Sequence, residues 1–188
     1  EAILTTHRHA DHVAGHAELA DRTGAQIFYL RGEADPSDDA EPLDDGESCA
    51  WGGVRVSVMA LPGHTRHHAG YVVDDVGLFS GDCIFSGSVG GCSSPQAGSF
   101  EEHRRSIVER VLSLPDDTAI YPGHAEATTV GRERSTNPFI RVMTGLDGAG
   151  VVPCLSLDRP ARLVVLARDF GGGTKALVLV DDDGSDMV

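Results

Sequence analysis

The apolar positions along the chain form short runs separated by turn residues, and most of these runs have the length or spacing of strands. Ala2–Thr6 and Gln26–Leu30 are short apolar runs of strand length. From Val54 to Ala60, valine and alanine recur at every second position, which is the period of a half-buried strand. Ala69–Val73 and Val76–Ser80 flank a pair of aspartates and predict a β-hairpin.

Other segments have the spacing of helices. Val13–Thr23 repeats apolar residues at helical spacing, and Gly24 follows where a helix C-terminus is expected. Ser99 precedes Glu102 by three residues, which is the capping-box pattern of a helix start. The buried stripe expected for this helix is Ile107, Val108, Val111 and Leu112. Thr118–Tyr121 adds a further strand, so strands and helices alternate and predict an α/β layered domain.

The remaining segments set the domain boundaries. Residues 31–48 are rich in acidic residues and predict a solvated loop. Near the C-terminus, Leu163–Ala167 and Ala176–Val180 flank three consecutive glycines and predict a hairpin. We therefore divide the chain into a main domain over residues 1–145 and a tail over residues 146–188, which comprises a linker and this hairpin.

Composition narrows the classes of function. The formal net charge is −14 and Lys175 is the only lysine, so the surface repels phosphate backbones and we expect no nucleic-acid partner. No apolar run approaches the roughly 18–20 residues that span a bilayer, so we expect no membrane partner. The chain begins at Glu1 without a secretory pattern, which indicates a processed or truncated chain and a cytoplasmic location. The cysteines form no CxxC pair and are expected to be reduced.

Four of the predicted strands end in turns that carry potential metal ligands. In three of these turns a glycine stands directly before the ligand, where the missing Cβ permits tight backbone geometry. The candidate ligands are His7, His9, Asp11, His12, His64, Asp82 and His124. His64, His124 or Asp82 alone would be an ordinary polar turn residue, and the alternative for the cluster from His7 to His12 is a solvated histidine-rich turn. Because sites in α/β domains assemble from loops outside the strand ends, the repeated pattern predicts that all of them converge.

The chemistry of these side chains points to metal ions. Imidazole and carboxylate are good ligands for borderline divalent cations such as Zn²⁺. Five histidines and two aspartates exceed the needs of one tetrahedral ion and suit two ions that share a carboxylate. Two such ions can hold a bridging hydroxide and polarise a substrate carbonyl, so no serine or cysteine nucleophile is required.

Taken in chain order, the four blocks resemble the metallo-β-lactamase superfamily, and most of all its glyoxalase II-like (hydroxyacylglutathione hydrolase-like) branch. The blocks are His7-x-His9-x-Asp11-His12, Gly63-His64-Thr65, Gly81-Asp82 and Gly123-His124. Flanking segments agree with this branch, namely Ile84–Gly90, Tyr121–His124, Thr128–Arg134 and Asn137–Phe139. The resemblance covers roughly residues 2–145, and it implies that the main domain is metallo-β-lactamase-like and catalytic.

The resemblance implies a fold, a ligand set and cofactors. The implied fold is an α/β, four-layer αββα sandwich with the metals at one edge. The first metal would be held by His7, His9 and His64 and the second by Asp11, His12 and His124, with Asp82 bridging both. Asp11 would also orient the attacking hydroxide, so Asp11 and Asp82 are the expected catalytic residues. The expected cofactors are two divalent ions, Zn in the first place and Fe as the alternative.

This chain departs from the branch in two respects. Gly91 stands where an arginine is usual, so a glutathione carboxylate would lack that contact; Arg66 is either a replacement contact or an ordinary surface arginine. The resemblance also implies strands before the first histidine motif, and we expect the fold to lack them here. We hypothesise that the C-terminal hairpin takes their place and completes the same sheet as Ala2–Thr6.

The leading function is a metal-dependent hydrolase that acts on a thioester or similar acyl bond of a small-molecule acyl or thiol-conjugate substrate. The alternative is a persulfide dioxygenase-like oxidoreductase with one iron held by His7, His64 and Asp82. A β-lactamase or a nuclease of the same superfamily ranks lower, because of the missing secretory pattern and the negative charge respectively. The non-enzyme interpretation is a metal-binding remnant with an incomplete sheet.

Overall fold

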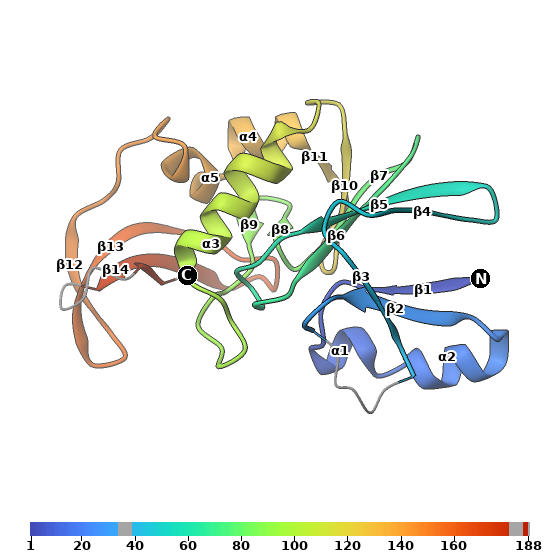
Figure 1. Cartoon of the computed structure of the whole chain (residues 1–188). Helices are drawn as coiled ribbons and strands as arrows, with labels where there is room; N and C mark the ends of the chain where they lie inside the picture. Colours follow the sequence, from blue (N-terminus) through green and yellow to red (C-terminus); the bar gives the residue numbers. More distant parts are fainter. Residues whose placement is uncertain (34–38, 181–185, 188) are drawn as a thin grey trace.

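The computed structural model describes residues 1–33, 39–180 and 186–187, and its strands form three sheets and a small hairpin (Figure 1). The first sheet is parallel, in the order β1-β2-β3, and comprises β1 (Ala2–Thr5), β2 (Gln26–Leu30) and β3 (Glu41–Leu43). The short helices α1 (Ala10–Val13) and α2 (His16–Thr23) connect β1 to β2 and lie along this sheet (Figure 1).

Two of the predictions for this region need correction. The helix expected over Val13–Thr23 is two helices, because the chain leaves helical pairing around Gly15 and α2 starts only at His16. Gly24 ends α2 in the left-handed conformation, with φ of 70°, as predicted. The predicted loop over residues 31–48 contains β3, which is too short to show a period, and it reaches Ser48 at the start of the next strand. Residues 34–38 of that prediction lie outside the described residues.

The second sheet has six strands in the order β11-β10-β7-β6-β5-β4. Its strands are β4 (Ser48–Trp51), β5 (Val54–Ala60), β6 (Ala69–Val73), β7 (Gly77–Gly81), β10 (Ala119–Pro122) and β11 (Thr128–Thr129). The pairing of β7 with β10 is parallel and the other pairings are antiparallel. The strands predicted from the apolar pattern here, including the β6–β7 hairpin, are therefore confirmed. A separate two-stranded hairpin comprises β8 (Ile84–Phe85) and β9 (Ser88–Val89).

Helices cover the other face of the six-stranded sheet (Figure 1). They are α3 (Phe100–Arg105) with its continuation over Ser106–Ser113, α4 (Val130–Thr136) and α5 (Pro138–Met143). Ser99 caps α3 in the predicted capping box: its hydroxyl accepts from the Glu102 backbone while its own N–H donates to the Glu102 carboxylate. Of the predicted stripe, three residues are buried and one is half-buried.

Two apolar cores hold these layers together. The core between the two sheets contains Leu30, Leu43, Val56, Val58, Ala69 and Tyr71. The core between the six-stranded sheet and the helices contains Leu61, Leu78, Ile84, Ile107, Val111, Ile120, Phe139 and Ile140. Helices, sheet, sheet and helices thus follow one another, and the predicted αββα sandwich is confirmed.

The tail forms a sheet of its own. It is antiparallel, in the order β12-β13-β14-β15, and comprises β12 (Val152–Ser156), β13 (Arg159–Arg168), β14 (Thr174–Val180) and β15 (Asp186–Met187). The predicted C-terminal hairpin is confirmed as the β13–β14 pair. The hypothesis that this hairpin completes the sheet of β1 is wrong, because in the described part of the chain neither strand pairs with β1, β2 or β3.

The apolar face of the hairpin explains where the tail lies. Leu177 belongs to the core beneath the helices, and Val164, Val165 and Ala167 pack against that core. These side chains of the tail therefore pack beside α5, at the opposite end of the molecule from β1 (Figure 1). Among the described residues, no helix is long and apolar enough to cross a membrane.

Candidate metal centre

The strand directions explain why the candidate ligands meet. Because β5, β6 and β7 are successive antiparallel neighbours and β10 is parallel to β7, the C-terminal ends of β5, β7 and β10 share one edge of the sheet. The end of β1 is held at the same edge, because the Tyr71 hydroxyl donates to the Thr5 carbonyl and the Ala69 N–H donates to the Thr6 carbonyl, each at 2.7 Å. The predicted convergence of the strand-end turns is therefore observed.

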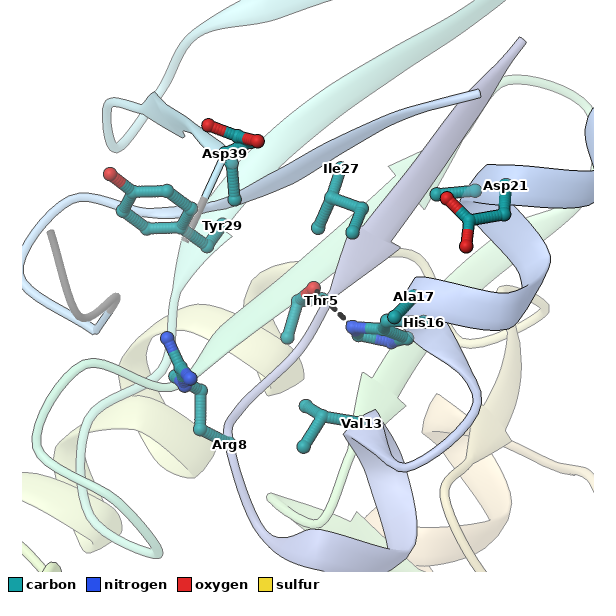
Figure 2. A pocket seen from close by; sticks show the side chains of 11 residues that line it. Thr5, Arg8, Val13, His16, Ala17, Asp21, Ile27, Tyr29 and Asp39 are labelled. Atoms are coloured by element: carbon teal, nitrogen blue, oxygen red, sulfur yellow. Dashed lines mark hydrogen bonds between the residues drawn. The ribbon is translucent and has the colours of Figure 1, made fainter. Parts of the chain in front are cut away.

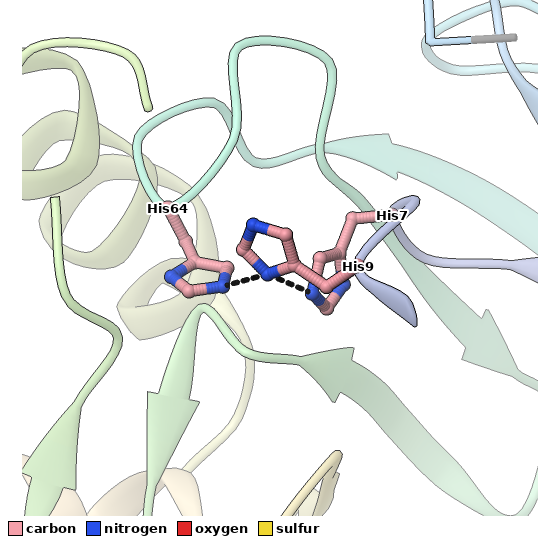
Figure 3. Close-up of side chains that lie close together, drawn as sticks. All are labelled: His7, His9 and His64. Atoms are coloured by element: carbon pink, nitrogen blue, oxygen red, sulfur yellow. Dashed lines mark hydrogen bonds between the residues drawn. The ribbon is translucent and has the colours of Figure 1, made fainter. Parts of the chain in front are cut away.

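The first group of side chains is formed by His7, His9 and His64 (Figure 3). His9 lies between the other two imidazoles, and its Nδ1 is 3.1 Å from Nε2 of His7 and 3.0 Å from Nε2 of His64. Two of the three nitrogen–nitrogen separations are therefore about 3 Å, and all three atoms lie within 4.8 Å of one another. Bonds of about 2.0–2.1 Å to a tetrahedral ion place neighbouring ligand atoms about 3.3 Å apart, so this group fits a metal ion.

The second group is formed by Asp11, His12 and His124. Oδ2 of Asp11 lies 3.2 Å from Nε2 of His124 and 3.7 Å from Nε2 of His12. The group therefore offers one carboxylate and two imidazoles, which is a donor set suited to a borderline divalent cation.

Asp82 lies between the two groups. Its Oδ2 is 3.6 Å from Nε2 of His64 and 3.5 Å from Nε2 of His124, so one oxygen faces a member of each group. Its Oδ1 lies 3.4 Å from Nε2 of His12. Among the described residues, these last two atoms are buried without a hydrogen-bond partner. Buried polar atoms without partners are rare in proteins, and a bound cation would satisfy both.

Neighbouring groups orient the imidazoles. Nδ1 of His64 donates to the Gly91 carbonyl at 2.8 Å, so in the neutral ring Nε2 keeps its lone pair for the centre. Nδ1 of His7 lies 3.1 Å from the Thr6 hydroxyl. Nε2 of His68 accepts the N–H of Asp82 at 3.1 Å, which fixes the backbone that carries this carboxylate.

Two glycines make the close approach of the turns possible. Gly81 has φ of 50°, and a Cβ there would lie 2.7 Å from Thr6 and 2.8 Å from His68. A Cβ on Gly123 would collide with the Asp82 carboxylate and with the His12 ring. The glycines that precede Asp82 and His124 in the sequence therefore serve the tight geometry that was predicted for them.

Burial and charge set the ionisation of the centre. Burial, with the other histidines adding to it, lowers the pKa of His7 from 6.5 to about 2. The close Asp82 carboxylate raises the pKa of His12. Burial alone would raise the pKa of Asp82, but the neighbouring His12, His64 and His124 outweigh it and the pKa is lowered. A neutral His7 and an ionised Asp82 are the forms that bind cations.

The centre is closed on one side and open on the other. The His7 side chain is fully buried, whereas His124 is 32% exposed and Asp11 is 59% exposed. A separate cavity of about 400 Å³ lies between α2 and the three-stranded sheet, next to Thr5 and His16 (Figure 2). None of the seven candidate ligands is among the residues that line it. A substrate would therefore approach the centre from the side of Asp11 and His124.

Residues outside the predicted set also contact the centre. His68, four residues after His64, has no predicted role. Phe170, from the turn between β13 and β14, stacks on the His124 ring with centroids 4.9 Å apart. No motif marks Phe170, because only the docking of the tail brings it to the centre. The buried Cys83 belongs to the core, as expected, and burial raises the pKa of Cys92 to about 12, which keeps it a thiol.

Comparisons with known proteins agree with this geometry. A layered αββα fold with clustered histidine and aspartate side chains at one edge of its sheets is the arrangement of a class of metal-dependent enzymes. The chain belongs to the metallo-beta-lactamase superfamily, because the model of this family matches residues 1–124. The resemblance predicted from the four motif blocks is therefore confirmed, together with the assignment as an enzyme.

Individual relatives refine the comparison. A hydroxyacylglutathione hydrolase from Chromohalobacter salexigens is 34% identical over 179 residues, which cover 75% of this chain and 68% of the relative. The crystal structure of TTHA1623 in a di-iron-bound form is 32% identical with a TM-score of 0.65, covering 73% of this chain and 76% of the other. ETHE1 from Myxococcus xanthus is 26% identical with a TM-score of 0.66, covering 78% of this chain and 69% of the other.

Proposed function

We propose that the protein is a binuclear metallo-hydrolase that cleaves the thioester bond of a small acyl-thiol conjugate. The observation that supports this most strongly is the arrangement of six donor side chains in two groups of three, with a seventh, Asp82, between the groups. The similarity to hydroxyacylglutathione hydrolases supports the thioester as the bond that is cleaved.

The proposed ligand assignment follows the two groups. His7, His9 and His64 hold the first ion, Asp11, His12 and His124 hold the second, and Asp82 contacts both. Zinc is the proposed metal, because its preferred ligands are these imidazoles and carboxylates. When bound, two such ions supply a water of lowered pKa and polarise the acyl carbonyl.

The protein's own residues then position the reactants. Asp11 is the exposed carboxylate at the open side, and it orients the attacking water by accepting a hydrogen bond from it. Asp82 is held by the hydrogen bond from its N–H to His68, and His64 by its hydrogen bond to Gly91. These fixed orientations allow the site to bind the substrate carbonyl without rearranging.

A metal analysis paired with a thioester assay tests the proposal. We expect about two zinc ions per purified chain and hydrolysis of S-lactoylglutathione or of a simpler acyl thioester. The Asp82→Asn and His9→Ala variants should retain a cooperative unfolding transition and lose turnover by at least about a hundredfold. His67→Ala is the matched control, because His67 is an exposed histidine three residues after His64 that belongs to neither group.

The same experiment separates the alternative functions. One iron per chain, with oxygen consumption in the presence of a persulfide and no thioester hydrolysis, would replace the hydrolase by the dioxygenase-like reaction. The di-iron-bound form of TTHA1623 makes iron a metal to be measured alongside zinc. Thioester hydrolysis that survives both substitutions would contradict the ligand assignment.

A further inference from the structure

The turn between β13 and β14 places an aromatic side chain directly on the metal centre. The Phe170 ring lies parallel to the His124 ring, with an angle of 7° between their planes. Its other neighbour is Phe85 of β8, whose centroid is 4.6 Å away. Phe170 therefore touches a candidate metal ligand, although it is 46 residues after that ligand in the sequence.

Polar contacts hold this turn against the main domain. Nζ of Lys175 donates to the Val89 carbonyl at 2.5 Å and lies 3.2 Å from the Asp169 carboxylate. The same carboxylate accepts a hydrogen bond from the Ser88 hydroxyl at 3.0 Å. We call these contacts the tail latch. The latch joins residues on both sides of Phe170 to strand β9 and thereby fixes the position of the ring.

The cation of the latch also contacts the aromatic pair. Nζ of Lys175 lies 5.6 Å from the Phe85 centroid and 5.8 Å from the Phe170 centroid, which is cation–π range. The Lys175 side chain is only 14% exposed. Lys175, the only lysine in the sequence, is thus engaged in holding the turn.

Phe170 is not buried by these contacts. It remains 43% exposed, and it adjoins His124, which is one of the two ligands at the open side of the centre. A rigid apolar ring beside the approach to a reactive centre offers surface that an apolar substrate group can cover.

We propose that Phe170 is a specificity-determining residue that packs against the apolar group next to the reacting carbonyl, and that the tail latch keeps it there. This inference rests on the proposed thioester hydrolysis and adds the class of substrate, a thioester with an apolar substituent. The substituent is either the acyl chain or the part of the thiol nearest the sulfur, and the assay below distinguishes the two.

The kinetic test compares Phe170→Ala with Leu166→Ala, a matched control on the same hairpin at a residue that is 59% exposed. One substrate series lengthens the acyl chain from acetyl to hexanoyl on a fixed thiol, and a second lengthens an alkyl thiol on a fixed acyl group. For the wild type we expect kcat/KM to rise along one of the series by about tenfold. Phe170→Ala should abolish that rise and Leu166→Ala should keep it. Lys175→Met should reproduce the Phe170→Ala profile.

A binding test reports on the turn without turnover. Phe170→Trp in a Trp51→Phe background carries a single indole, because Trp51 is the only tryptophan. We expect Co²⁺ to quench this indole and S-hexylglutathione to shift its emission saturably. Leu166→Trp in the same Trp51→Phe background should show neither the quenching nor the shift. The metal content of each variant is also measured. It separates the loss of the Phe170 contact from the loss of a bound ion.

The outcomes distinguish a failure of the proposed thioester hydrolysis from a failure of the proposed role of Phe170. If no thioester is hydrolysed by the wild type, the proposed function fails, and the indole titrations alone decide the placement of Phe170. An equal loss of kcat/KM for every substrate in Phe170→Ala would overturn the role of this residue, as would an indole at position 170 that responds to neither probe. The same holds if Leu166→Ala matches Phe170→Ala along the series.

Discussion

The buried His103 should make the protein less stable in acid, and replacing it should remove that effect. His103 lies on α3 with no exposed surface, and neither ring nitrogen has a hydrogen-bond partner among the described residues. Burial, with smaller contributions from His64 and Lys175, lowers its pKa from 6.5 to about 3. The folded state therefore keeps His103 neutral at pH values where the unfolded chain takes up a proton.

The sign and size of the effect follow from proton linkage. Because the folded pKa lies below the unfolded pKa, the proton-linked destabilisation by His103 is absent above about pH 6.5 and grows as the pH falls toward 3. One pKa unit corresponds to about 1.4 kcal/mol, so between pH 7 and pH 5 this group alone removes about 2 kcal/mol. His103→Leu also removes two unpaired polar atoms, which adds about 1–3 kcal/mol of stability at both pH values.

Urea unfolding followed by circular dichroism, with EDTA in all samples, measures this effect. We expect His103→Leu to be more stable than the wild type at pH 7 and its advantage to grow by about 2 kcal/mol at pH 5. His67→Leu, at an exposed histidine, is the control for the substitution itself. An advantage that is the same at both pH values would refute the reasoning, as would a variant less stable than the wild type.

Three further substitutions test a buried hydrogen-bond network, a helix cap and the packing of a turn at the centre. Glu133→Ala removes a buried carboxylate that accepts three hydrogen bonds and should lower the free energy of unfolding in urea by about 3 kcal/mol, with Glu133→Gln retaining part of it. Ser99→Ala removes the cap of α3 and should cost about 1 kcal/mol, and an unchanged unfolding midpoint would contradict the capping box. Gly123→Ala puts a methyl group against Asp82 and His12 and should weaken zinc binding at least about tenfold in a competitive titration, whereas unchanged affinity would mean that the turns are farther apart.

Local patterns predicted most of the elements. Strand β5 has the bounds that its two-residue period indicated, and the capping box located the start of α3. The break between α1 and α2 could not be predicted. A glycine lowers helix stability, but the sequence does not show whether tertiary packing keeps the helix continuous through it. Strand β3 was missed because three residues are too few to establish a period.

The convergence of the candidate ligands could also be predicted, because it depends on strand ends that the sequence marks with glycine. What could not be predicted are the groups that orient them. Gly91 offers only a backbone carbonyl to His64, and every residue has one. His68 is a histidine among several, and its partner is a backbone N–H. Such contacts leave no residue-type signal of their own.

The tail shows the limit of pattern-based prediction most clearly. Its hairpin could be predicted, but the surface against which the hairpin packs could not. An apolar strand pattern indicates that the strand is buried, and it does not indicate which surface covers it. The contacts that place Phe170 join residues 81 to 86 positions apart. The candidate ligands and the proposed specificity residue Phe170 therefore depend on different parts of the chain. A chain that kept the four strand-end motifs and lost the tail latch should still bind metal, but it should discriminate less between substrates. Metal affinity and the slope of kcat/KM with substrate length should accordingly respond to different substitutions.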